Sequence, residues 1–140
     1  MNTIEETFIK TFVMRDRRES WLHRLASPKT RTKQLHRLAH SFDRDLDHRY
    51  MYDKEQPPDH VAVKVEQLLT EWKKSNQQHL CHIIAFSSER DGQLMNLEEA
   101  ETDYSLTFGA VIVVIPDTLA YYHTERSNLS QQPFYILFRP

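Results

Sequence analysis

Glycine and cysteine are scarce in this sequence, and their scarcity excludes several classes of protein. There are two glycines and one cysteine among 140 residues. A glycine-rich phosphate loop, a dinucleotide-binding fingerprint and a Gly-x-Ser-x-Gly nucleophile elbow all need glycines closer together than Gly92 and Gly109. The single cysteine, Cys81, excludes an internal disulfide framework and a cysteine-based zinc cluster, and it favours a reducing, cytoplasmic location.

Long apolar runs are also missing. The longest run, residues 110–115, has six residues, whereas a membrane-spanning helix needs roughly 20. Glu5 and Glu6 precede the apolar residues from Phe8 onward, and Lys10 interrupts those residues, which is unlike a signal peptide. We therefore expect a cytoplasmic protein. With 39% hydrophobic and 27% charged residues, the chain has the balance of one globular domain, residues 1–140.

Apolar residues recur at helical spacing in the first half of the chain, residues 1–76. The spacing predicts one long helix over residues 3–26 and a second helix after Ser27 and Pro28, so that the two form a hairpin. A third helix is predicted to begin at Asp59, and its apolar face comprises Val61, Val65, Leu68, Leu69 and Trp72. Residues 43–58 lack a period and are predicted to be an irregular connection.

The second half, residues 79–140, is rich in β-branched and aromatic residues. Four strands are predicted, at residues 80–87, 108–115, 118–124 and 134–138. Pro116 and Asp117 predict a hairpin turn, and Asn96 is expected to cap a short acidic helix. The sequence therefore predicts an α+β fold, with three N-terminal helices packed on one face of a mainly antiparallel four-stranded C-terminal sheet.

Two of these strands, at residues 108–115 and 134–138, are apolar on both faces. A strand with one solvent face should alternate apolar and polar residues. Either the sheet curls into a partial barrel, or its second face meets another subunit. We favour the second interpretation, which predicts a homodimer through the sheet.

Three segments together resemble a bacterial family of small proteins for which no activity is known. They are WLHRLASPKTRTKQLHRLAHSFDRDLDHRY at 21–50, DGQLMNLEEA at 91–100 and IPDTLAYYHTE at 115–125. The positions that fit the family pattern are His40, Asp47, Leu97 to Ala100 and Leu119 to Tyr121. The sequence departs from it at Ser41, which precedes Phe42, and at Asp117, where the family has glycine. The resemblance implies a bacterial, cytoplasmic protein and nothing catalytic.

The charges are unevenly distributed along the chain. Residues 10–40, which we call the basic hairpin, contain nine Lys and Arg against two acids, a local charge of +7. Residues 41–140 contain nine basic and sixteen acidic residues, a charge of −7, and Glu5 and Glu6 complete the net charge of −2. The candidate anion-binding residues are Arg15, Arg17, Arg18, Arg24, Lys29, Arg31, Lys33 and Arg37.

Two uses of the basic hairpin are open at this point. The favoured one is non-catalytic: the hairpin packs against acidic residues of the same chain or of a protein partner, so that the protein is a binding or protein-interaction module. The alternative is nucleic-acid or polyanion binding. Trp21 lies among the cations, but its helical spacing with Leu22 and Leu25 indicates a core residue rather than a base-stacking platform.

A metal-dependent hydrolase is a further alternative. His36 and His40 lie four residues apart on a predicted helix, and Asp47 could complete a two-histidine, one-carboxylate set. Against it, the HExxH glutamate is missing and Arg37 would repel a cation. Histidines on a solvated basic helix explain the pattern as well, so we expect no cofactor. Cys81 could be a nucleophile activated by histidine, but a buried core cysteine is the more common case.

Overall fold

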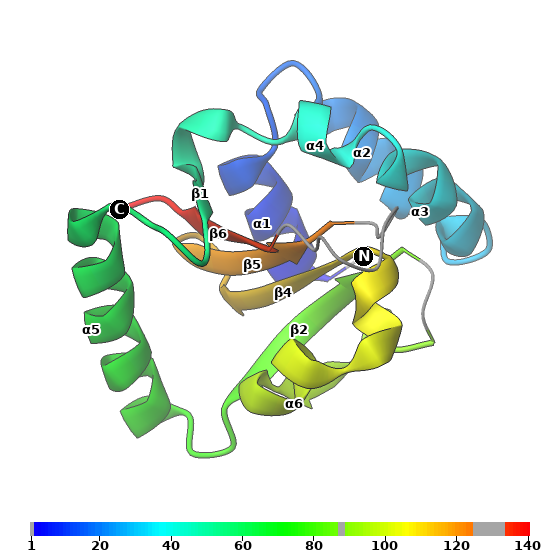
Figure 1. Cartoon of the computed structure of the whole chain (residues 1–140). Helices are drawn as coiled ribbons and strands as arrows, with labels where there is room; N and C mark the ends of the chain where they lie inside the picture. The colour runs from blue at the N-terminus through cyan, green and yellow to red at the C-terminus, as the bar shows by residue number, and fades with distance from the viewer. Residues whose placement is uncertain (1, 87–88, 125–133) are drawn as a thin grey trace.

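A six-stranded antiparallel sheet forms the centre of the protein (Figure 1). The computed structural model describes residues 2–86, 89–124 and 134–140. The strand order is β1-β6-β5-β4-β2-β3. The strands are β1 Met51–Asp53, β2 Leu80–Ala85, β3 Leu94–Asn96, β4 Ala110–Ile115, β5 Leu119–His123 and β6 Phe134–Phe138. The α+β class is confirmed, and the four predicted strands correspond to β2, β4, β5 and β6.

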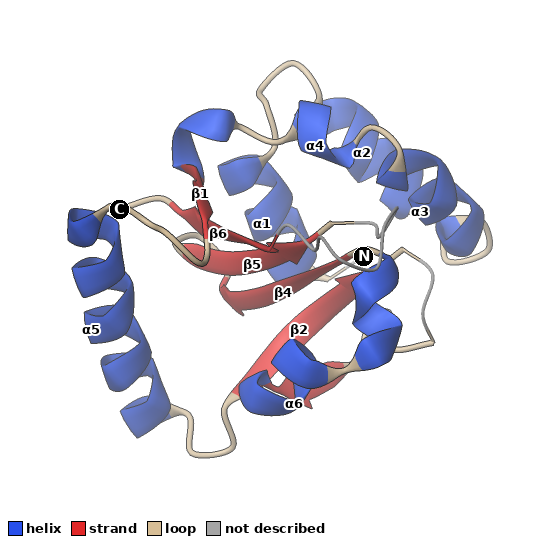
Figure 2. Cartoon of the chain, viewed as in Figure 1, coloured by secondary structure: helices blue, strands red, loops and turns tan. Residues whose placement is uncertain are grey.

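Six α-helices accompany the sheet in the described residues (Figure 2). They are α1 Thr3–Phe12, α2 Arg18–Leu25, α3 Arg31–Ala39, α4 Phe42–Asp45, α5 Asp59–Ser75 and α6 Leu97–Thr102, with 3-10 helices at His48–Tyr50 and Tyr104–Phe108. The helix predicted to begin at Asp59 is confirmed as α5. The predicted cap of α6 is confirmed too, because the Asn96 side chain accepts hydrogen bonds from the N–H groups of Glu98 and Glu99.

The single helix predicted over residues 3–26 is wrong, because the chain forms α1 and α2 with a break between them. Val13 leaves the helical conformation and forms a β-bridge with Leu46. The Met14 N–H then donates to the Asp45 carbonyl at 2.7 Å. These contacts with a segment some thirty residues away satisfy backbone groups that a continuous helix would pair internally.

The segment 43–58, predicted to be irregular, holds more structure than its sequence indicates. It contains the end of α4, a 3-10 helix and β1, which pairs with β6 so that Met51 lies opposite Leu137. Strands of three residues, such as β1 and β3, are too short to show an alternating pattern. The prediction of four strands therefore missed both edges of the sheet.

Helices cover both faces of the sheet. On one face, α1 to α4 enclose a core centred on Phe42. The centroid of its ring lies 4.7–5.0 Å from the ring centroids of Trp21, Phe86 and Tyr122. On the other face, α5 and α6 pack against the sheet through residues such as Val61 and Leu97. The expectation that three helices share one face is thus wrong, because α5 lies on the face opposite α1 and α3.

The two covered faces explain why β4 and β6 are apolar throughout. In β4, Val111 and Val113 face the α1–α4 core, whereas Ile112 and Val114 face α5 and α6. Helices of the same chain therefore account for the observation from which we predicted a homodimer. The homodimer itself stays a prediction. Among the described residues, no helix has the length and apolar character needed to cross a membrane.

Candidate functional site

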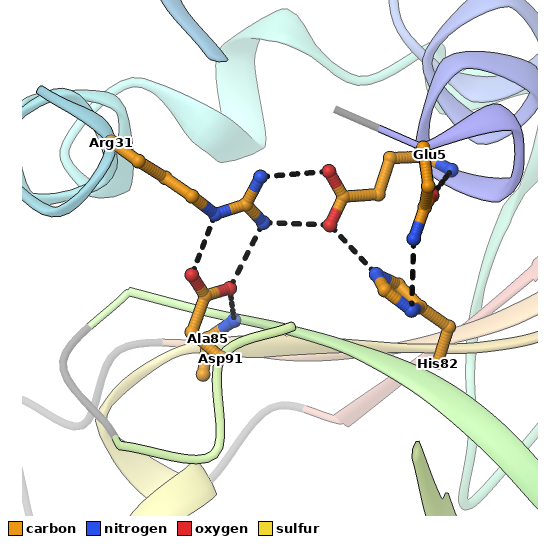
Figure 3. Close-up of polar contacts among 6 residues, drawn as sticks. Glu5, Arg31, His82, Ala85 and Asp91 are labelled. Carbon is orange, nitrogen blue, oxygen red and sulfur yellow. Dashed lines mark hydrogen bonds and ion pairs between the residues drawn. The ribbon is translucent and has the colours of Figure 1, made fainter. Parts of the chain in front are cut away.

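A partly buried ion-pair network connects the basic hairpin to the sheet (Figure 3). The Arg31 guanidinium donates to both carboxylate oxygens of Glu5, at 2.7 and 2.6 Å. It also donates to both oxygens of Asp91, at 2.7 and 3.1 Å. His82 Nε2 lies 2.7 Å from Glu5 Oε2. One arginine thus bridges two carboxylates, and a buried histidine supports one of them.

Local sequence features place each member of this network. Glu5 lies in the first turn of α1, where the helix dipole favours an acid and where the Asn2 side chain caps the helix. Arg31 is the first residue of α3. Asp91 lies in the turn between β2 and β3, beside Gly92 with a φ of 80°, and it also accepts the Ala85 N–H at 3.0 Å.

The network fixes the charges of Glu5 and Arg31. Burial alone would raise the pKa of Glu5, but the hydrogen bonds from His82 and Arg31 and the guanidinium charge outweigh it and lower the pKa to about 2. Burial likewise lowers the pKa of Arg31, and its bonds to Asp91 and Glu5 outweigh this and raise it. At neutral pH Glu5 is therefore ionised and fully engaged, so it serves as a fixed link between α1, α3 and β2.

The structure separates the eight candidate anion-binding residues. Arg31, with 17% of its side chain exposed, is used inside the network. Arg18 is half-buried and its Nε donates to the Val13 carbonyl at 2.9 Å. The six that remain exposed are Arg15, Arg17, Arg24, Lys29, Lys33 and Arg37. Of the eight candidates, Arg31 and Arg17 pair with acidic residues of the same chain, and Arg31 is the one whose ion pairs reach α1 and the turn between β2 and β3.

The acidic residues around α6 are paired with cations other than those of the basic hairpin. Glu98 lies 3.4 Å from Lys73, Glu101 lies 3.4 Å from Lys54, and Asp103 lies 3.3 Å from Arg90. These acids therefore do not provide the counter-charge of the hairpin.

The predicted metal ligands are not assembled into a site. His36 is exposed on α3, and His40 is exposed at the C-cap of that helix. Asp47 is buried and paired with Arg49 through bonds of 3.0 and 2.7 Å, and the Arg49 hydrogen bonds lower its pKa. Within the described ranges, no group of three or more His, Cys, Asp or Glu side chains could hold a metal ion.

Cys81 lies in the core between the sheet and α5 and α6. Burial raises the pKa of its thiol to about 12, and the charges of Glu98 and Glu101 add to the effect. We expect Ellman's reagent to react with the native protein roughly a thousandfold more slowly than with the unfolded chain, because so little thiolate is present. Reaction in guanidinium chloride is the control. Equal rates in the two states would contradict the buried position.

Sequence reasoning missed one further cluster, around Asp45 at the end of α4. This carboxylate is buried, and its Oδ2 accepts a hydrogen bond from Trp21 Nε1 at 2.9 Å. Arg17 and Arg44 both approach its Oδ1. Residues 43–58 have no regular hydrophobic pattern, so nothing in that segment indicated that the Asp45 side chain would be buried.

Comparison of the chain with protein-family models, curated protein sequences and solved structures gives no match. The resemblance of residues 21–50, 91–100 and 115–125 to a bacterial family therefore stays an expectation from those motifs. Among the residues of this chain, the exposed cations of the basic hairpin are the strongest indication of function.

Proposed function

We propose that the protein is a non-catalytic binding module that holds the phosphate backbone of a nucleic acid on its basic hairpin. One observation carries the proposal: six of the eight candidate anion-binding residues are exposed, and five of those six, all except Arg17, form no ion pair within residues 2–86, 89–124 and 134–140. A cytoplasmic, bacterial setting would supply such a polyanion in abundance.

The distribution of charge favours a polyanion over a single small anion. Lys33 and Arg37 lie one turn apart on the exposed side of α3, and Lys29 precedes that helix. Repeated cations at this spacing can neutralise several phosphates at once. Arg31 lies in the same segment, but its guanidinium pairs with Glu5 and Asp91. This pairing fixes α3 against the sheet and does not involve the exposed cations.

Binding is expected to be insensitive to base sequence. The one tryptophan of the hairpin, Trp21, is fully buried, so it cannot stack on a base. Phosphate contacts position a protein on nucleic acid but carry no sequence information. A protein partner with an acidic surface would meet the same cations.

The test is a salt titration of binding to short mixed-sequence DNA and RNA duplexes. If five cations each neutralise one phosphate, the slope of log K against log salt should be about −4 to −5. The double variant Lys33→Glu, Arg37→Glu should bind about tenfold or more weakly and have a shallower slope.

A matched control makes the same charge change elsewhere. Lys64 and Lys74 are exposed on α5, on the opposite face, so Lys64→Glu, Lys74→Glu should leave binding unchanged. Equal loss in both double variants would indicate a net-charge effect and overturn the proposal. So would binding to a poly-glutamate peptide without binding to either duplex, which would point to an acidic protein partner.

A further inference from the structure

The Asp45 cluster places two exposed arginines around one buried carboxylate. Asp45 is 5% exposed. Its Oδ2 is held by Trp21 Nε1, and Ser41 Oγ lies 3.3 Å from the same oxygen. Its Oδ1 is buried and has no hydrogen-bond partner among the described residues. The carboxylate is thus fixed in position while one of its oxygens still lacks a donor.

Two guanidinium groups supply charge to that oxygen without bonding to it. Arg17 Nε lies 3.9 Å and Arg44 Nε 3.7 Å from Asp45 Oδ1, both beyond hydrogen-bond distance. The two arginine side chains are 51% and 72% exposed. In the described part of the chain, neither guanidinium donates a hydrogen bond, so their N–H groups are available to a ligand.

We infer that Arg17 and Arg44 form a clamp for one phosphate group and that Asp45 is the positioning residue that holds them together. The inference rests on the proposed function and deepens it, because it assigns a defined phosphate subsite at one end of the basic hairpin. Arginine forks match the oxygens of a phosphate and can bind them bidentately. Two forks near a common point can hold the same phosphate.

Asp45 has a definite part in this arrangement. Its charge attracts both guanidinium groups to one place, and this reduces the conformational freedom that binding would otherwise remove. Because each arginine approaches through Nε at more than 3.5 Å, the terminal Nη groups are not used by the carboxylate. The pair keeps a net charge of +1 beside Asp45, and Arg15 and Arg24 belong to the same basic hairpin.

Duplex binding by Arg17→Gln, Arg44→Gln and the double variant tests the clamp. If both arginines hold one phosphate, the two single losses will not add, and the double variant will change the salt slope by about 0.9. Arg24→Gln and Arg37→Gln are the matched pair. Their losses should add, and their double variant should change the slope by about 1.8. Additive losses and a slope change of about 1.8 at Arg17 and Arg44 would overturn the clamp.

Inorganic phosphate provides a test that does not depend on nucleic acid. The arginine Nε–H signals of Arg17 and Arg44 should shift saturably as phosphate is added at constant ionic strength, while those of Arg24 and Arg37 stay in place. Asp45→Asn keeps an acceptor for Trp21 and should weaken this binding about tenfold, with unchanged tryptophan fluorescence as the check on folding. Shifts of equal size at all four arginines would overturn the clamp.

The two tests separate the two proposals. Phosphate binding at Arg17 and Arg44 without duplex binding would retain the clamp and reject the nucleic-acid function. Duplex binding with independent contributions from Arg17 and Arg44 would retain the function and reject the clamp.

Discussion

Replacement of Arg31 by methionine is expected to lower the free energy of unfolding by about 3–5 kcal/mol. The substitution keeps much of the side-chain volume but removes the cation that bridges Glu5 and Asp91. Glu5 would remain as a buried carboxylate supported by His82 alone. Urea denaturation at pH 7 measures the effect. If the free energy of unfolding of the variant falls with urea concentration at the wild-type slope, the folded state of the variant stays compact.

Arg37→Met is the control for this loss, because Arg37 lies in the same helix but is exposed. It should change the free energy of unfolding by no more than about 0.5 kcal/mol. Adding Glu5→Gln to Arg31→Met should recover part of the loss, since the uncompensated charge is removed with its partner. An Arg31→Met protein as stable as the Arg37→Met protein would mean that the network contributes nothing to the fold.

Acid should remove about 3 kcal/mol of stability through Glu5 alone. The pKa of Glu5 is about 2 in the folded protein and 4.5 ordinarily, so the folded state binds its proton less readily than the unfolded state. The contribution is therefore complete above pH 4.5 and is lost progressively as the pH falls toward 2. Urea unfolding curves at a series of pH values between 2 and 6 measure this slope.

Glu5→Gln isolates the contribution of this carboxyl from those of other acids. Asp47 and Asp103 also have lowered pKa values, so the wild-type protein loses stability in acid at several groups. The variant should be less stable than wild type at pH 7, and the difference should shrink as the pH falls from 4.5 to 2. Parallel stability curves for the two proteins would show that Glu5 titrates normally in the folded state.

Local patterns predicted the parts of the fold that depend on local energetics. The helical period of Val61, Val65 and Trp72 predicted α5, and the turn at Pro116 and Asp117 predicted the β4–β5 hairpin. The helix buries one face along its length, and the hairpin reverses the chain within a few residues, so both depend on residues that are close in the sequence. Their patterns are accordingly complete within short windows of sequence.

Contacts between distant segments determined what the sequence could not predict. The break between α1 and α2 depends on the bridge from Val13 to Leu46, and β1 exists because β6 pairs with it. The face on which α5 packs depends on the connections around it rather than on its own amphipathic pattern, which is the same for either face.

The candidate site shows the same division. The sequence revealed that residues 10–40 are basic, but it could not distinguish Arg31 from Lys33. They carry the same charge two positions apart, yet Arg31 is paired with Glu5 and Asp91, which lie 26 and 60 positions away in the chain. Asp45 was missed for the same reason. Its role depends on its contacts with Trp21 and Arg17 in the folded protein and not on its neighbours in the sequence.

The pairing of β1 with β6 has a consequence for the order in which the chain folds during synthesis. Residues 51–53 leave the ribosome more than eighty residues before their partners at 135–137. Arg31 likewise emerges well before Asp91. The closure of such long loops slows folding relative to helical bundles. In the nascent chain the basic hairpin is therefore complete before the sheet that anchors it.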